Sequence, residues 1–245
     1  MRMQQTSSNP LLSEKSFRTE FGAQSSNVMT QSGAYNKVAI LLLLCLATAS
    51  YTFSSGMTGL MLPGFIGGLV FALITIFKKS WAPFTAPIYA LCEGLALGGI
   101  SYAYQAAYAP GLVTNAIMLT FAVLALMFFM YRYEIIKVTE KFQKIMSISI
   151  GAIAIVYLVN LIMSFFGSSI PMIHEAGPIG IGFSLVVVGI ASFSLLMDFD
   201  FIQKAADSGS MPKYMEWYAA FGLMVTLVWL YLEILRLLAK LQDRR

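Results

Sequence analysis

Seven long runs of apolar residues divide this sequence, and they constrain its fold more than any other feature. They cover approximately residues 38–53, 60–77, 86–104, 114–131, 145–166, 177–197 and 218–238. A run of about 18 or more apolar residues is long enough to cross the hydrocarbon core of a bilayer as a helix. None of the runs alternates in segments of about ten residues, as the strands of a membrane β-barrel do. The sequence therefore predicts an all-α integral membrane protein with seven transmembrane helices.

The composition argues against a soluble domain. Of the 245 residues, 58% are hydrophobic and only 11% are charged, whereas soluble domains carry about 25% charged residues. One soluble domain of this length would not need so much apolar surface to form its core. The excess of apolar residues lies in the seven runs, so the class of a polytopic membrane protein follows from composition and pattern together.

The domain organisation follows from where the apolar runs begin and end. Residues 1–35 are rich in Ser, Gln, Asn and Thr and lack apolar periodicity, so we expect a disordered polar cytoplasmic tail. Residues 36–240 should form the seven-helix transmembrane domain, and residues 241–245 a short C-terminal tail.

Two pairs of glycines predict close contacts between helices. Gly64 and Gly68 lie four residues apart in the second run, and Gly94 and Gly98 have the same spacing in the third run. Small residues at this spacing form one helix face that a neighbouring backbone can approach closely. Glycines that are merely tolerated in lipid would show the same spacing, so the sequence leaves both interpretations open.

The distribution of Lys and Arg predicts the orientation in the membrane. If the N-terminus is cytoplasmic and all seven runs cross, the inner segments contain Arg2, Lys15, Arg18, Lys37, Lys78, Lys79, Arg132, Lys137, Lys141, Lys144, Lys204 and Lys213. The outer loops then contain no Lys or Arg, in agreement with the positive-inside rule. The remaining basic residues are Arg236, Lys240, Arg244 and Arg245. Either the last run crosses and places them outside, or it is re-entrant and returns them to the inside. We expect a multi-pass protein of the cell inner membrane.

Five acidic residues lie in or beside the apolar runs and are the candidate pH-sensing or ion-pathway residues: Glu93, Asp198, Asp200, Glu216 and Glu233. An ionisable group inside a membrane span is a functional candidate by default because its burial is costly. The segment "SFSLLMDFDFIQKA" ends the sixth run with two of them. Two residues correspond to about 200° around a helix, so these two aspartates cannot face the same cavity.

Structural roles compete with functional ones for most of these acids. Asp198 and Asp200 could be interfacial residues that reach the headgroups. Glu216 would stabilise the first turn of the last helix through the helix dipole. Glu233 has Arg236 three residues on as a natural partner. Glu93 in "ALCEGLALGG" has no basic residue beside it, so the functional interpretation is strongest there.

The sequence lacks the motifs of the common membrane enzymes and cofactor proteins. His174 is the only histidine and lies in a predicted outer loop. There is no H-E-x-x-H motif, no Ser–His pair, no phosphate-binding loop and no Gly-x-Gly-Asp of an intramembrane aspartyl protease. We therefore expect no enzyme activity, no cofactor and no nucleic-acid partner. Carboxylate oxygens suit the handling of protons or Ca²⁺, with Ca²⁺ as a transported ion.

Four segments resemble the Bax-inhibitor-motif transmembrane family, in particular its bacterial branch. They are "CEGLALG" in the third run, "FDFIQ" at the end of the sixth, "MEWYAAFGL" at the start of the seventh and "LYLEILRLL" at its end. The resemblance extends over all seven runs and implies a bundle of six helices around a central seventh. Some members are pH-sensitive Ca²⁺ leaks, others bind and restrain a membrane-bound ATP-dependent protease, and animal relatives are linked to suppression of cell death.

The resemblance also implies site residues. The family's proton-sensing pair is one aspartate near the end of the sixth span, which falls on Asp200, and one acid within the seventh span. The second position falls on Glu233 if "LYLE" sets the register, and near Thr226 if "RLL" does. Asp198 or Glu216 could stand in for it. The family latches the aspartate with a basic residue of the second span, for which the candidates are Lys78 and Lys79. Lys204 is a third lysine that could pair with Asp200.

Two functions follow as expectations. The first is a pH-sensitive cation leak that passes Ca²⁺. The alternative is a regulator without transport activity that binds an ATP-dependent membrane protease through its N-terminal tail and inner loops.

Overall fold

The computed structural model of the protein describes residues 27–167 and 176–244. Within these residues, seven helices are long and apolar enough to cross a membrane. They are α2 (Gln31–Ser55), α3 (Met61–Phe77), α4 (Ala82–Ala107), α5 (Leu112–Arg132), α6 (Glu140–Phe165), α8 (Pro178–Asp207) and α9 (Met215–Asp243). Two short 3-10 helices, η2 (Thr58–Leu60) and η3 (Lys79–Trp81), precede α3 and α4. The predicted all-α fold with seven membrane helices is confirmed.

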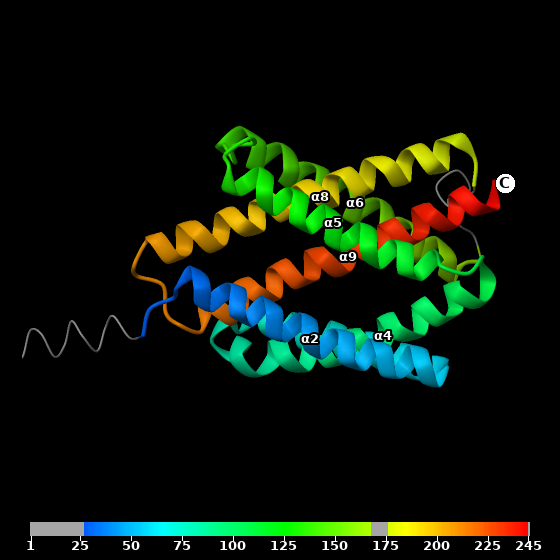
Figure 1. The fold of residues 1–245 in the computed structure, drawn as a ribbon, viewed down its shortest axis with the longest axis horizontal. Coiled ribbons are helices and arrows are strands. Elements are labelled where there is room, and N and C mark those ends of the chain that lie inside the picture. Colours follow the sequence, from blue (N-terminus) through cyan, green and yellow to red (C-terminus); the bar gives the residue numbers. More distant parts are fainter. Residues whose placement is uncertain (1–26, 168–175, 245) are drawn as a thin grey trace, which may run out of the picture.

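Successive helices run in opposite directions, so the loops gather at two ends of the bundle (Figure 1). We call the end where α2 begins the N-terminal end; it also carries the loop between α8 and α9. The end where α9 finishes is the C-terminal end. Because α9 is one continuous helix from Met215 to Asp243, the last apolar run crosses the bundle and is not re-entrant.

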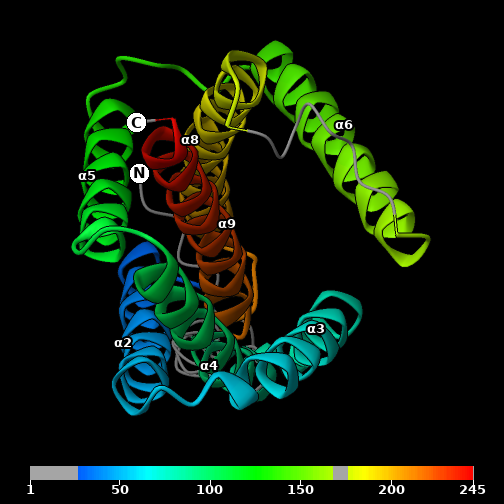
Figure 2. The same cartoon turned by 90° about the vertical axis from the view of Figure 1, so that its right-hand side faces the viewer.

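Helix α9 is the central helix, and α2, α4, α5 and α8 pack along it. The other two helices form an outer layer, in which α3 packs mainly against α4 and α6 packs against α8 (Figure 2). The least buried of the seven is α6. The implied arrangement of six helices around a seventh is thus refined to four helices along α9 and two outside them.

The helix boundaries differ from those expected at both ends of the chain. Helix α2 begins at Gln31 and not at residue 36, because Thr30 caps it by accepting a hydrogen bond from the Gly33 N–H. Helix α9 continues through Asp243 and therefore includes most of the expected C-terminal tail. The rest of the expected N-terminal tail, residues 1–26, lies outside the described residues, as does His174.

The glycine pairs form the predicted close contacts on both sides of α4. A Cβ atom at Gly94 would overlap the carbonyl oxygen of Cys45 on α2, and one at Gly64 would lie 2.7 Å from the carbonyl oxygen of Cys92 on α4. Gly68 and Gly98 are equally enclosed, by the Glu93 carboxylate and the Ala49 carbonyl. The absence of a side chain therefore lets α2 and α3 approach α4 at backbone distance.

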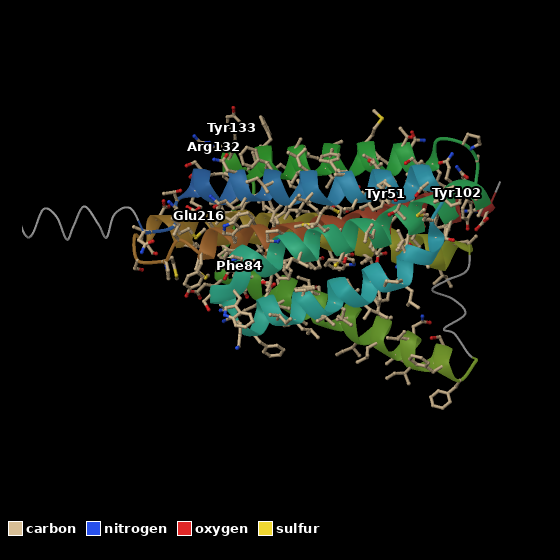
Figure 3. All side chains as sticks on the ribbon, turned by 90° about the horizontal axis from the view of Figure 1, so that it is seen from below. Tyr51, Phe84, Tyr102, Arg132, Tyr133 and Glu216 are labelled. Carbon is tan, nitrogen blue, oxygen red and sulfur yellow. The ribbon has the colours of Figure 1, made fainter. Side chains whose placement is uncertain are left out.

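Exposed aromatic side chains mark both ends of the bundle (Figure 3). Phe84 and Tyr133 lie toward the N-terminal end, and Tyr51 and Tyr102 lie toward the C-terminal end. Aromatic residues gather at the two interfaces of membrane proteins, where their rings meet the headgroups. Their positions therefore agree with helices that cross the bilayer from one end of the bundle to the other.

Candidate functional site

Asp200 is a buried carboxylate near the C-terminus of α8, at the N-terminal end of the bundle. Its residue is only 7% exposed. Its Oδ2 atom forms an ion pair with Lys204 Nζ at 2.7 Å, one helical turn further along α8, and the Lys204 side chain is 62% exposed. The same oxygen accepts a hydrogen bond of 3.1 Å from Gln143 Nε2 on α6. Asp200 thus bonds both to the exposed Lys204 ammonium and to Gln143 on the outer helix α6.

A polar pocket of about 210 Å³ lies beside Asp200 at this end of the bundle. Its lining comes from the end of α5, the α5–α6 loop and α8, namely Tyr131, Arg132, Glu134, Ile136, Lys137, Val138, Asp200 and Gln203. Glu134 has a φ of +50°, a value uncommon for residues other than glycine that allows a tight turn here. The hydroxyl of Tyr131 donates to Gln203 Oε1 at 2.9 Å, so α5 and α8 are also joined across the pocket.

Asp198 faces a different helix from Asp200. Its side chain approaches the Thr226 hydroxyl of α9. Its Oδ2 atom is buried and has no hydrogen-bond partner among the described residues. The angular separation predicted for the two aspartates is therefore observed, since Asp200 faces α6 and Asp198 faces α9.

Glu233 lies on α9 in the half of the bundle nearer the C-terminal end and is 1% exposed. Arg236 Nη1 donates to both of its carboxylate oxygens, at 2.9 and 3.0 Å. The hydroxyl of Tyr157 on α6 donates to Oε1 at 2.7 Å, and Trp229 Nε1 does so at 3.3 Å. The predicted pairing of Glu233 with Arg236 is confirmed. The position on α9 that meets an α8 aspartate is Thr226, so Asp200 and Glu233 do not form the acid pair implied by the resemblance.

Glu216 holds the start of α2 and takes no part in the Asp200 pocket. Its Oε1 atom accepts hydrogen bonds from the Thr30 N–H (3.0 Å) and the Thr30 hydroxyl (2.9 Å). Its Oε2 atom forms an ion pair with Lys37 Nζ at 3.1 Å. Figure 3 shows Glu216 beside the start of α2. Main-chain hydrogen bonds between residues 27–29 and 211–213 strengthen this attachment.

Glu93 projects from α4 toward Gly68 of α3. It lines a groove of about 290 Å³ between α3, α4 and α9 whose other walls are apolar, formed by Phe65, Leu69, Ala72, Ile76, Tyr89, Phe221, Gly222 and Val225. Among the described residues, Glu93 forms no ion pair or hydrogen bond with any other side chain. It is a half-buried acid at the edge of the bundle.

The five acids therefore occupy separate places. Within residues 27–167 and 176–244, no three His, Cys, Asp or Glu side chains come together as ligands of a metal ion would. A protein site for Ca²⁺ uses six to eight oxygen ligands. The candidate carboxylates therefore lie as single groups at separate positions in the described part of the bundle.

The latch expected from Lys78 and Lys79 is not formed. The Lys78 ammonium lies 4.3 Å from the centre of the Trp81 ring, and the Lys79 ammonium lies 5.1 Å from that of Tyr218. The cation at Asp200 is Lys204. The reason is the position of α3, which packs against α4, whereas α8 packs against α5, α6 and α9.

Two partners of the acids, Gln143 and Tyr157, were not predicted from the sequence, whereas Lys204 was one of the three lysines considered for Asp200. Lys204 follows Asp200 by four residues, a spacing that places two side chains on one helix face, so a local signal existed. Gln143 and Tyr157 are polar residues of α6, but no local pattern says which neighbouring helix they meet. These two contacts depend on how α6 packs.

Fold and site together define a multi-pass helical membrane protein with isolated buried acids, one of which is linked to the surface by a lysine. A profile of the family described as Bax inhibitor 1 like matches residues 9–243. The chain belongs to this family, and the resemblance seen in the sequence is confirmed. No curated protein and no solved structure matches the chain.

Proposed function

We propose that this protein is a pH-sensitive cation leak of the cell inner membrane that passes Ca²⁺, with Asp200 as the titrating gate residue. One observation carries the proposal. Of the five candidate acids, Asp200 combines burial, an ion pair with an exposed lysine and a hydrogen bond to the outer helix α6. A change of pH in the water around Lys204 can therefore change the charge of Asp200, and this change acts on α6 through the hydrogen bond from Gln143.

The gating step follows from the contacts of Asp200. Protonation removes its attraction for the Lys204 ammonium and weakens the hydrogen bond that its charged oxygen accepts from Gln143. The attachment of α6 to α8 at the N-terminal end of the bundle then becomes weaker. Arg132 and Lys137 line the same pocket, and their positive charges oppose cation entry in the closed arrangement. Protonation shifts the population toward an arrangement in which α6 has moved away from α8.

Ca²⁺ flux into proteoliposomes at several pH values tests this function. Asp200→Asn removes the charge without a change of shape, so the flux should become independent of pH. Glu134→Gln is the matched control, because Glu134 lines the same pocket but its side chain is exposed; it should keep the pH profile of the wild type. Absence of flux at every pH, or a wild-type pH profile in Asp200→Asn, contradicts the proposal.

A second candidate function is the binding of a membrane-bound ATP-dependent protease through residues 1–26. It is supported by the way Asn27, Met29 and Glu216 attach the chain before α2 to the α8–α9 loop, which gives the preceding residues a defined starting point at the N-terminal end. Deletion of residues 1–26 leaves this attachment in place. The leak should survive the deletion, whereas protease binding should be lost. A deletion that abolishes flux would contradict the leak as stated, and a deletion that leaves binding intact would contradict binding through residues 1–26.

We further propose that the N-terminal end of the bundle is cytoplasmic. The charge distribution supports this orientation. Arg236 is paired with Glu233 inside the bundle, and Lys240 donates to the Gly180 carbonyl and the Ser184 hydroxyl of α8. Arg236 and Lys240 therefore serve in the packing of α9, and only Arg244 and Arg245 of the four C-terminal basic residues still depart from the positive-inside rule.

Cysteine labelling tests the orientation. In a chain without its native cysteines, Arg244→Cys should react with an impermeant thiol reagent added from the periplasmic side. Lys213→Cys, in the exposed α8–α9 loop, should react only after the membrane is made permeable. The reverse pattern would show that the N-terminal end faces the periplasm.

A further inference from the structure

The corner between α3 and α4 carries a groove to which the proposed leak assigns no role. The groove measures about 330 Å³ and is lined by Leu73, Ile74, Phe77, Lys78 and Trp81. Its walls are apolar side chains of the last two turns of α3, and its rim is formed by η3. It lies at the N-terminal end of the bundle and faces outward, where Phe77 and Trp81 are exposed.

Lys78 lines this groove, and Lys79 follows it in the chain at the start of η3; neither forms an ion pair with an acid among the described residues. The Lys78 ammonium is held over the Trp81 ring and the Lys79 ammonium over the Tyr218 ring. Three other lysines at the same end are neutralised by acids, in the pairs Lys37–Glu216, Lys137–Glu134 and Lys204–Asp200. Within the described part of the chain, no carboxylate forms an ion pair with Lys78 or Lys79. The corner therefore has an uncompensated positive charge directly above an apolar groove.

We propose that this corner is a binding site for one anionic phospholipid. One acyl chain lies in the groove against Leu73, Ile74 and Phe77, and the phosphate is held by Lys78 and Lys79. The site is apolar along the last turns of α3 and cationic just beyond them. A phospholipid has the same sequence of parts, an apolar tail followed by a charged headgroup. A basic side chain next to the membrane surface attracts anionic lipid, and an aromatic ring such as that of Trp81 is stable at headgroup level.

Charge decides which lipid binds. A phosphatidylcholine headgroup carries a choline cation that offsets its phosphate, so it leaves the two ammonium groups uncompensated. Phosphatidylglycerol carries a net negative charge and compensates one of them. Free inorganic phosphate would meet the lysines but would leave the groove empty.

Native mass spectrometry of the full chain, released from detergent containing phosphatidylglycerol or phosphatidylcholine, measures the preference directly. The wild type should retain phosphatidylglycerol in preference to phosphatidylcholine, by roughly fivefold for each lysine that contacts the headgroup. The variant Lys78→Gln/Lys79→Gln should lose this preference. Lys141→Gln/Lys144→Gln is the matched control, because it removes two exposed positive charges from α6 at the same end of the bundle; it should keep the preference.

Fluorescence quenching locates the lipid. In a Trp217→Phe/Trp229→Phe background, Trp81 is the sole tryptophan, and phosphatidylglycerol brominated on its acyl chains should quench it more than brominated phosphatidylcholine does. Inorganic phosphate should not remove this difference. The proposal is overturned if the Lys78/Lys79 variant keeps its preference, if the Lys141/Lys144 control loses it equally, or if both brominated lipids quench Trp81 alike.

Discussion

The two outer helices, α3 and α6, are attached to the bundle in opposite ways. Helix α3 meets α4 at backbone distance, with Gly64 and Gly68 in the contact. A buried hydrogen bond of 2.7 Å between the hydroxyls of Thr75 and Thr85 adds to it. Close packing of this kind sums many small dispersion contacts over the length of the interface.

Helix α6 has no comparable backbone contact. Gly151, near its middle, has no atom of a neighbouring helix within 4 Å of the place where a Cβ would stand. Side-chain contacts hold the helix instead: hydrogen bonds from Gln143 to Asp200 and from Tyr157 to Glu233, and ring contacts of Phe142 with Phe193 and of Tyr157 with Phe183 on α8. The two acids that the family resemblance implied as a pair therefore serve as the two polar attachment points of α6.

This difference indicates that α6 can move more easily than α3. An interface with close backbone contacts along its length resists displacement as a whole, whereas a helix attached by a few side-chain contacts can shift when one of its two polar bonds is lost. Changes of volume should therefore affect α3, and changes of charge should affect α6. The three variants below test this comparison, from the largest expected effect to the smallest.

The largest loss of stability is expected from Glu233→Leu. The substitution leaves the Arg236 guanidinium and the Tyr157 hydroxyl without their common acceptor inside the bundle. Removing one partner of a buried ion pair costs about 3 kcal/mol of unfolding free energy or more. Equilibrium unfolding in detergent or bicelles measures this loss.

Glu134→Leu is the control for that variant. Glu134 also pairs with a basic residue, Lys137, but the two side chains are 76% and 73% exposed. An exposed pair contributes from nothing to about 1 kcal/mol, so the unfolding free energy should change little. Equal losses in the two variants would show that burial of the Glu233 network does not stabilise the protein.

An intermediate loss is expected from Gly64→Ala. The new Cβ would lie 2.7 Å from the Cys92 carbonyl oxygen and 2.8 Å from the Ala96 nitrogen, so α3 must move away from α4. Overpacking of this kind costs about 2 kcal/mol. Gly151→Ala on α6 meets no neighbour and should instead stabilise the helix by about 0.5 kcal/mol. Effects of the same sign in both variants, measured by equilibrium unfolding, would remove the distinction between α3 and α6.

The smallest change in stability, but a visible change in position, is expected from Gln143→Leu. This variant breaks the bond from α6 to Asp200 and leaves the Lys204 ion pair in place. One partly buried hydrogen bond to a charged group is worth about 1.5 kcal/mol. Spin labels at Ile148 on α6 and Leu126 on α5, both exposed, should show a broader distance distribution.

The matched measurement uses labels at Ile66 on α3 and Leu126 on α5. This distance should stay the same in Gln143→Leu, because α3 makes its contacts with α4 and does not depend on the bond between α6 and α8. Broadening of both distances would mean that the bundle loosens as a unit. An unchanged α5–α6 distance would mean that the bond to Asp200 does not hold α6.

The sequence was sufficient for the number and type of the helices, because the need to cross a bilayer acts on each segment separately. It was less accurate for their ends. Helix α4 begins at Ala82 where the apolar run begins at 86, and α6 begins at Glu140 where the run begins at 145. The first turn of α6, which Thr139 caps, is polar and therefore belongs to the helix but not to the apolar run.

For the candidate site, the sequence determined the contacts that lie within one turn of a helix. The ion pairs Asp200–Lys204 and Glu233–Arg236 have spacings of four and three residues, and the regular geometry of a helix brings such neighbours together. The separate orientations of Asp198 and Asp200 follow from the same geometry.

Only the tertiary structure decided which helix each polar side chain meets. A helix has the same sequence pattern whichever neighbour packs on a given face. The contacts of Gln143 with Asp200, of Tyr157 with Glu233 and of Lys79 with Tyr218 therefore depend on the assembled bundle. The glycine faces of α3 and α4 place α3 on α4 and away from α8. For this reason Lys78 and Lys79 lie at the corner between α3 and α4, against Trp81 and Tyr218, and do not meet the carboxylate they were expected to latch.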